Sequence, residues 1–245
     1  MNNTRAPLIS VITVVRNGAA TLATTLASVH MQRQIDVEHL VIDGASTDGT
    51  IDIIKANESE QLRWISEPDH GIYDAMNKGI SLARGEWLLF LGADDALADQ
   101  MVLADIFMDR DLLEYDLVCG RSNYEDGREC SPRLDWRTMI FNTIHHQAAF
   151  YRRRLFDRFR YRLDIPVVAD YEMNFLIYRQ HQLVLFLDRE IAISGKHGVS
   201  HTCSQSAVQI SMFRIRSRHM NTLLNTALLI IGFANLAITR LRGVF

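Results

Sequence analysis

The segment 66–79, with the sequence SEPDHGIYDAMNKG, concentrates groups that could bind a polar ligand. It holds carboxylates, a histidine, an asparagine and two glycines, and it lies between an apolar run and a helical pattern. A connection between a strand and a helix ordinarily needs only about two to six residues. The surplus of polar and conformationally special residues favours a wall of a binding site over a plain turn.

Two adjacent aspartates, Asp94 and Asp95, end the segment GEWLLFLGADD and could bind a divalent cation. Carboxylate oxygens are ligands that Mg²⁺ and Mn²⁺ prefer, and such an ion can in turn bridge phosphates. Paired aspartates also occur in turns and at helix N-caps, so the pair alone does not decide. Its position after an apolar strand, in line with the other polar clusters, favours the metal.

The elements that must position these groups alternate between strands and helices from residue 8, which is typical of βαβ units and a parallel sheet. Strands are predicted over Leu8–Val15, Glu38–Asp43, Leu62–Ser66 and Glu86–Leu91, and helices from about Ala20, around 51–54 and over Tyr73–Arg84, the last ending at Gly85 in a left-handed cap. The polar clusters then follow the carboxyl ends of parallel strands, where open α/β sheets bind ligands.

Beyond Leu112 the pattern is less regular. It predicts a strand over Asp116–Gly120, a hairpin through 125–128, a short helix near Trp136, a helix over Ala169–Arg179 and a strand pair from 183–188 and 190–194. No repeat or linker interrupts the chain. We expect an α/β domain over 1–203, with halves of about 1–112 and 113–203, and a helical tail over 204–245.

The cysteine content and the N-terminal sequence indicate the cellular compartment of the protein. Three scattered cysteines are too few for a disulfide framework, and the N-terminus MNNTRAPLIS lacks the basic start and apolar run of a signal peptide. A cytoplasmic protein is therefore expected. All 29 acidic residues lie at or before Glu190, whereas the last 55 residues contain six basic residues, so the tail is expected to meet an anionic partner.

The glycine fingerprints of dinucleotide and P-loop sites are absent, so a nucleotide must be held otherwise. The segments TVVRNGAATL and IDGASTDGT have the composition of loops that hold a base and ribose through backbone and carboxylate contacts. Taken alone, Asp43 and Asp48 favour a turn followed by a helix cap. Only the combination of segments favours a nucleotide.

Seven segments together resemble the inverting family 2 glycosyltransferases with the GT-A fold, and the likeness is closest to the bacterial exopolysaccharide type represented by colanic-acid glycosyltransferases. They are TVVRNGAATLATTLASV, VIDGASTDGT, SEPDHGIYDAMNKGI, GEWLLFLGADD, HHQAAFY, ADYEMNF and the GVS of KHGVS, spread over residues 8 to about 200. The resemblance implies a Rossmann-like, mostly parallel central sheet with flanking helices, the first half binding the nucleotide sugar and the second the acceptor.

The resemblance also implies roles for individual residues. The nucleotide-sugar side would be formed by Asn17, Asp43, Asp69, Gly71, Asn77, Lys78 and Asp94, and the acceptor and sugar side by His146, Gln147 and Glu172. Asp95 would bind the metal and Asp170 would be the general base, in a motif where this chain has Ala169 instead of the usual glutamate. A helix N-cap is the structural alternative for Asp170. Where relatives often have two glycines before Val-Ser, this chain has His197 and Gly198.

The implied reaction is an inverting transfer of a hexose from a nucleotide-diphosphate sugar, expected to be a UDP-sugar, to a saccharide acceptor, expected to be lipid-linked, in bacterial polysaccharide biosynthesis. The acceptor hydroxyl would attack the anomeric carbon while the nucleoside diphosphate leaves from the opposite face. Asp170 would take the proton, an assistance of roughly 10²- to 10⁴-fold. A divalent cation, Mn²⁺ or Mg²⁺, would stabilise the leaving diphosphate.

The tail contains 19 residues without a charge, from Asn221 to Thr239, which is borderline for a membrane span of about 20 residues. At 100° per residue its weakly polar residues form one narrow stripe: Asn221, Asn225, Gly232, Asn235 and Thr239. With arginines at both ends, this favours a helix lying in the membrane interface, at the inner face of the cytoplasmic membrane. Packing on the domain itself or on a second subunit, as in a homodimer, stays open.

Two other functions compete with the glycosyltransferase. A nucleotide-binding or scaffold protein on the same fold, without catalysis, is left open by Ala169 and His197. A nucleic-acid binder could use the basic tail, but the acidic body and the lack of a recognition motif stand against it.

Overall fold

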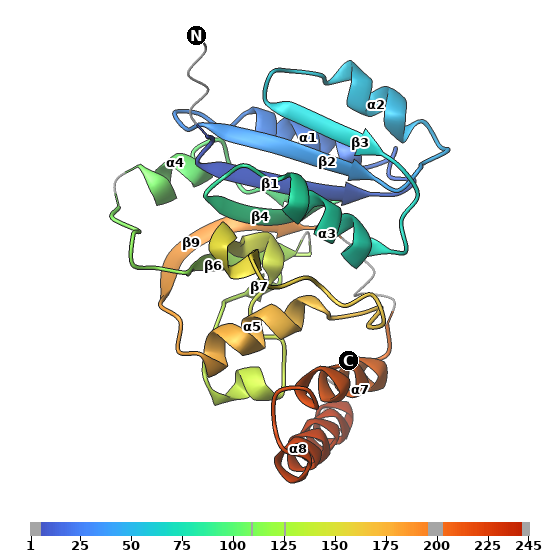
Figure 1. Cartoon of the computed structure of the whole chain (residues 1–245), viewed down its shortest axis with the longest axis vertical. Coiled ribbons are helices and arrows are strands. Elements are labelled where there is room, and N and C mark those ends of the chain that lie inside the picture. The colour runs from blue at the N-terminus through green and yellow to red at the C-terminus, as the bar shows by residue number, and fades with distance from the viewer. Residues whose placement is uncertain (1–5, 109, 125, 196–202, 242–245) are drawn as a thin grey trace.

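The structure, a computed structural model, describes residues 6–108, 110–124, 126–195 and 203–241, and within them it contains one nine-stranded sheet (Figure 1). The strand order is β3-β2-β1-β4-β8-β6-β9-β5, with β7 paired to β6. The predicted α/β architecture with a mostly parallel first half is confirmed.

Four parallel strands form the first half of the sheet. They are β1 (Ile9–Val15), β2 (Val37–Asp43), β3 (Leu62–Ser66) and β4 (Trp87–Gly92). The first three point the same way in Figure 1, so the loops that follow them leave from one edge. All seven residues of β2 are buried, as expected of a parallel strand that is covered on both faces.

Alternate residues of these strands point into two hydrophobic layers. On one face Ile12, Leu88 and Phe90 pack against α3 (Ile72–Leu82) and α5 (Asp170–Arg179). On the other face Trp87 and Leu89 pack against α4 (Val102–Phe107), and α1 (Leu22–His30) and α2 (Thr50–Ala56) cover the same side of β1 and β2. The sheet is thus a rigid support with helices on both faces.

The second half of the sheet is mixed. Strand β8 (Ala149–Arg152) inserts antiparallel between β4 and β6 (Leu117–Tyr124), and β6 pairs parallel with β9 (Val184–Ser194). The short strands β5 (Ala96–Leu97) and β7 (Glu129–Cys130) complete the edges, and β7 closes the hairpin predicted at 125–128. Three 3₁₀ turns connect this half: η1 (Trp136–Met139), η2 (His146–Ala148) and η3 (Arg153–Phe156).

Some predicted boundaries are wrong: β6, predicted to end at Gly120, runs to Tyr124, and two further differences have a local cause. The strand pair from 183–188 and 190–194 is one continuous strand, β9, because the register shifts around Arg121 in β6 absorb the irregularity without a turn. The third helix ends at Leu82 rather than in a left-handed cap at Gly85, because the chain becomes extended at Ala83. There the amide of Gly85 donates to Oγ of Ser10 at 2.7 Å.

Two helices follow the sheet at its lower end in Figure 1: α7 (Gln205–Arg216) and α8 (Thr222–Leu241). Met212 and Ile215 of α7 belong to the same hydrophobic cluster as α5, which attaches the pair to the domain.

Candidate active site

The loops after β1 and β2 are tied together at the carboxyl edge of the sheet. The amide of Asn17 donates to Oγ of Ser46 at 2.7 Å, and the side-chain oxygen of Asn17 accepts the amide of Thr47 at 2.9 Å. Asp48 accepts the amides of Ala19 and Thr50, at 3.0 and 3.1 Å. The backbone of Asn17 is left-handed (φ 53°), and its side chain, through the bond to Thr47, helps to fix the shape of this loop.

Asp43 ends β2 with one oxygen satisfied and the other unpaired. Its Oδ2 accepts from the amide of Ser46 at 3.0 Å and from Oγ of Ser66 at 2.6 Å. Its Oδ1 is buried and has no hydrogen-bond partner in the described part of the chain. Leaving a buried acceptor unpaired costs about 1–3 kcal/mol, so the site is suited to a ligand that donates an N–H there.

Asp69 and Gly71 form the turn that opens α3. Oδ1 of Asp69 accepts the amide of Gly71 at 2.9 Å, and Gly71 has a φ of 112°, a conformation that favours glycine. The other oxygen of Asp69 lies against Gly44, the residue after Asp43, where an added Cβ would be only 2.2 Å from it. The segments after β2 and β3 therefore meet, and the amino-terminal end of α3 faces this edge.

Asn77 and Lys78 hold neighbouring segments of the chain together beside the site. The side chain of Asn77 donates to the carbonyl of Tyr161 and accepts its amide, both at 2.8 Å, which uses both polar atoms. Lys78 donates to the carbonyl of Pro68 at 2.7 Å and pairs with Glu67 at 2.9 Å. The contact of these two side chains with the nucleotide stays a prediction; in the structure their polar atoms hold the neighbouring loops.

Asp94 and Asp95 follow β4 at the same edge. Asp95 is buried; its oxygens accept the amides of Gly92 at 2.8 Å and of Gly195 at 3.0 Å. Burial and the charge of Asp94 raise the pKa of Asp95 above its usual value. No group of three or more His, Cys, Asp or Glu side chains that could hold a metal occurs in the described ranges. A cation here would need ligands from its substrate.

Asp170 begins α5, and three other segments hold its buried carboxylate. The hydroxyl of Tyr73 donates to Oδ1 at 3.0 Å, and the side-chain amide of Asn142 donates to Oδ2 at 2.8 Å. Nδ1 of His146 lies 3.4 Å from the same Oδ2. The N-cap of the helix is Ala169, so Asp170 is not the cap, and its side chain faces the turn that opens α3.

These contacts favour an ionised Asp170. Burial alone would raise its pKa, but the hydrogen bond and charge of His146, with the bonds from Asn142 and Tyr73, lower the pKa of Asp170 below its usual value. Burial would lower the pKa of His146, whereas the hydrogen bond and charge of Asp170 and the charge of Asp95 raise it. Burial and Asp170 also raise the pKa of Tyr73 well above its usual value, so its hydroxyl stays a donor.

Two of these donors were not predicted from the sequence. Tyr73 opens an amphipathic helix and is only 9% exposed, so its pattern indicates a core residue. Asn142 is oriented by a chain of two hydrogen bonds. Its side-chain oxygen accepts from the side-chain amide of Asn174 at 2.9 Å, and the side-chain oxygen of Asn174 accepts from the hydroxyl of Tyr151 at 2.8 Å. The one available signal was the position of Asn142 just before HHQAAFY.

The residues predicted for the acceptor side lie in two different places. His146 and Gln147 lie in η2, and His146 contacts Asp170 as described. Glu172 points elsewhere: its Oε1 lies 2.7 Å from Nε2 of His219, in the turn between α7 and α8. The role of Glu172 on the acceptor side stays a prediction; residues two apart on a helix do not share a face, so Glu172 and Asp170 point different ways. His197 and the GVS motif lie outside the described residues, which end at Gly195, the residue whose amide donates to Asp95, and resume at Cys203.

A cavity of ≈ 410 Å³ opens beside residues that surround Asp170. Its wall includes Asn142, a donor to Asp170, and His145, which precedes His146 and whose Nδ1 lies 3.0 Å from Oγ of Ser122. Sites for small ligands commonly occupy about 300–1,000 Å³, so the volume suits a sugar unit.

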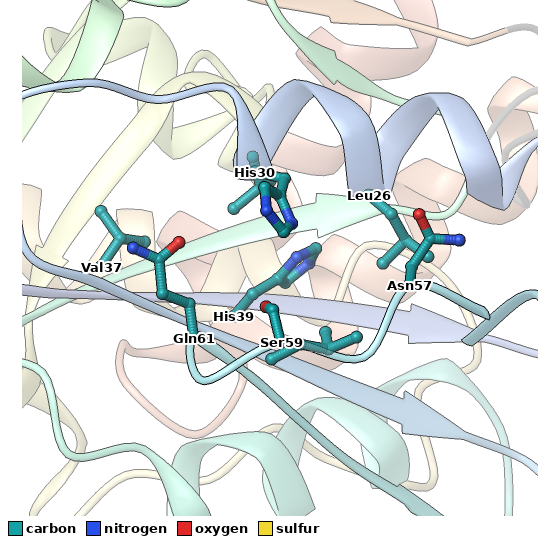
Figure 2. A pocket seen from close by; sticks show the side chains of 9 residues that line it. Leu26, His30, Val37, His39, Asn57, Ser59 and Gln61 are labelled. Atoms are coloured by element: carbon teal, nitrogen blue, oxygen red, sulfur yellow. The ribbon is translucent and has the colours of Figure 1, made fainter. Parts of the chain in front are cut away.

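A second hollow, under α1, is unsuitable for a ligand. Figure 2 shows His30 and His39 facing it, with Asn57, Ser59 and Gln61 around them. Its volume is ≈ 10 Å³, about enough for one water molecule. It also lies toward the opposite ends of β2 and β3 from Asp43.

Comparisons with known proteins show the family and the fold. Residues 10–181 match the family model described as Glycosyl transferase family 2. A PGL/p-HBAD biosynthesis glycosyltransferase of Mycobacterium tuberculosis is 39% identical over 189 residues, covering 73% of each chain. S. aureus TarS in complex with UDP-GlcNAc is similar with a TM-score of 0.72 at 18% identity, over 92% of this chain and 71% of that one. The mannosyltransferase PcManGT from Pyrobaculum calidifontis, in complex with GDP-Man and Mn²⁺, gives 0.67 at 18% identity, over 97% and 76%.

Proposed function

The chain belongs to glycosyl transferase family 2, and from this premise we propose that it transfers a hexose from a UDP-sugar, with inversion, to a hydroxyl of a saccharide carried on a lipid, in bacterial exopolysaccharide biosynthesis. The observation that carries the proposal is the hydrogen bond from Tyr73 to Asp170. It joins the helix that follows Asp69 and Gly71 to the residue expected to act as base, so the donor and the acceptor hydroxyl would meet between them.

The donor side has the groups that a nucleotide sugar needs. The unpaired Oδ1 of Asp43 can accept the ring N–H of a uracil. Asp69 and Gly71 lie between it and the amino-terminal end of α3, whose partial positive charge suits a diphosphate. Two structurally similar proteins support a nucleotide-sugar donor, since TarS is described with UDP-GlcNAc and PcManGT with GDP-Man.

The residues after β4 fit a divalent cation. Mg²⁺ is commonly bound through one or two carboxylates plus substrate phosphates rather than by a cage of protein ligands. Asp95 and Asp94 supply such a pair, and each oxygen of Asp95 keeps a lone pair beyond its bond from a backbone amide. Bound there, Mn²⁺ or Mg²⁺ would act as a Lewis acid on the diphosphate. PcManGT, which is described with Mn²⁺, supports this reading.

Asp170 is placed to take the proton of the acceptor hydroxyl. As the new bond between the acceptor oxygen and the anomeric carbon forms, the bond from that carbon to the diphosphate oxygen breaks, and the hydroxyl proton passes to Asp170. The contacts with Tyr73, Asn142 and His146 fix the carboxylate and keep it ionised before the reaction. The cavity beside Asn142 and His145 would hold the acceptor sugar.

The test is release of nucleoside diphosphate from a panel of UDP- and GDP-sugars, with and without saccharide acceptors. Asp170→Asn should lower kcat by roughly 10²-fold or more while nucleotide binding is kept. Glu172→Gln is the matched control, because it changes a carboxylate on the same helix that faces His219. Equal loss in both variants would contradict the role of Asp170. Nucleotide binding without turnover of any donor would instead favour the scaffold function.

A further inference from the structure

Helix α8 turns most of its large apolar side chains to solvent. The narrow stripe that it turns to the protein includes Asn225 and Gly232 of the predicted polar stripe, whereas Asn221 and Asn235 are exposed. Asn225, Leu228, Gly232 and Leu236 are buried against the rest of the chain at helical spacing. The outer side carries Leu223 and Ile230, which are 86% and 64% exposed, together with the exposed Leu224, Ile231, Phe233 and Ile238. A helix that ends at water normally shows the reverse arrangement.

The inward stripe is held by a buried arginine. Arg216 of α7 is fully buried, and its Nε donates to Oδ1 of Asn225 at 2.9 Å. Asn225 in turn donates to the carbonyl of Phe213 at 2.9 Å. Rotating α8 to hide its apolar side would break both bonds and leave a buried guanidinium without this partner, which is costly. The apolar side is therefore fixed outward.

The exposed face is long. A helix of 20 residues is about 30 Å long, and α8 has this length. Over Thr222–Thr239 the mean hydropathy is 1.7, only 22% of the window is buried, and the sequence has no charge there. By length and composition the helix could cross a membrane. Because Asn225 on its inward stripe is hydrogen-bonded to α7, the helix is instead held in a position to lie along a membrane surface.

The charge at the start of α8 is positive. Arg218 is exposed in the turn between α7 and α8, and no acidic residue occurs in the sequence after Glu190. Arg214 is also exposed, but it pairs with Asp164 at 3.3 Å. Two copies packed through α8 would bring these positive ends together. Anionic headgroups complement them, and each basic side chain near an anionic surface contributes about 1 kcal/mol. Apolar length and positive charge thus favour a bilayer over a second copy.

We propose that the outer face of α8 docks on an anionic lipid bilayer. The helix lies in the interface, with Leu223 and Ile230 among the acyl chains and Arg218 at the headgroups. The docked helix is attached to the active site through α7, because Arg216 also approaches the hydroxyl of Tyr171 at 3.5 Å and His219 contacts Glu172, both on the helix that begins with Asp170. The inference stands on the helix alone and does not depend on the proposed reaction.

The test is flotation of the full chain with vesicles of phosphatidylcholine, alone or mixed with about a third of phosphatidylglycerol. We expect flotation with the anionic vesicles. The double variant Leu223→Gln/Ile230→Gln should bind at least about tenfold more weakly, since it removes two inserted side chains. The control Leu113→Gln/Leu183→Gln makes the same change at leucines that are 73% and 52% exposed elsewhere, and should bind as the native chain does.

Charge and self-association are separated by two further measurements. Arg218→Gln should weaken binding to the anionic vesicles about fivefold, and equal binding to neutral and anionic vesicles would contradict the headgroup contact. Light scattering without lipid should give the same mass for the native chain and the Leu223→Gln/Ile230→Gln variant. A native dimer that this variant dissociates, or a native chain that floats with neither vesicle, would overturn the proposal.

Discussion

Nδ1 of His146 lies 3.4 Å from Oδ2 of Asp170, and each residue shifts the pKa of the other toward its charged form. The two come from different elements, η2 and α5, which are joined by the sheet core rather than by sequence. In the proposed reaction Asp170 must stay ionised until it receives the proton of the acceptor hydroxyl, so the charge of its neighbour sets how readily it does so.

The activity should rise with pH as His146 loses its proton. Below the raised pKa of His146, its positive charge stabilises the Asp170 carboxylate and weakens it as a base. Above that pKa the charge is gone and Asp170 is a stronger base, so kcat rises. In His146→Gln this step should be absent. The profile of kcat against pH for both proteins checks this. His181→Asn, at an exposed site after α5, should keep the native step.

The stability of the fold should fall in acid because of His39. This side chain is buried in β2, 2.9 Å from Oγ1 of Thr13, and burial lowers the pKa of His39 to about 3. The unfolded chain binds a proton near pH 6.5, so stability is full above that pH and is lost as pH falls toward 3. Between pH 7 and 4.5 the native chain should lose about 2–3 kcal/mol more than His39→Gln in urea unfolding.

A matched control makes the His39 experiment specific. His70, whose side chain is 87% exposed, can be changed to glutamine without altering the core. His70→Gln should lose stability in acid as the native chain does. Parallel curves for the native chain and His39→Gln would show that the buried imidazole is not the source of the acid sensitivity.

Gly44→Ala should weaken nucleotide binding without unfolding the protein. The new methyl group would lie 2.2 Å from Oδ2 of Asp69, so Asp69 must move away from the turn that opens α3. We expect a loss of affinity for the nucleoside diphosphate of about tenfold or more, measured by titration calorimetry. Gly127→Ala, where an added Cβ meets nothing within 4 Å, should bind normally apart from a small loss of stability from its positive φ. Unchanged affinity in Gly44→Ala would remove Asp69 from the site.

Much of the fold could be predicted because short runs rich in apolar and β-branched residues alternate with helical patterns in the first half of the chain. Strand β3 has the predicted limits, Leu62–Ser66, and β2 ends at the predicted Asp43. Strand β8 was missed because four residues between two 3₁₀ turns carry no periodicity, and its insertion between β4 and β6 is decided by tertiary packing. The tail was predicted as helical, but which side of α8 faces the protein is decided by the bond from Arg216 to Asn225, which sequence periodicity does not reveal.

The candidate site could be predicted as a location more readily than as a set of contacts. Strand ends place Asp43 and Asp95 at one edge by topology alone. The bonds of Asn77 to Tyr161, 84 residues away, and the approach of Tyr73 to Asp170, 97 residues away, require the folded chain. For Glu172, helical geometry alone predicts that its side chain does not share a face with that of Asp170.

The central claim is a site for a metal-bound nucleoside diphosphate at Asp95, and calorimetric titration of UDP with and without Mn²⁺ tests it most directly. The native chain should bind UDP tightly only when Mn²⁺ is present, and Asp95→Asn should lose the metal-dependent part of the affinity. A native chain that binds neither UDP nor GDP with Mn²⁺, or an Asp95→Asn variant that binds as the native chain does, would contradict the account.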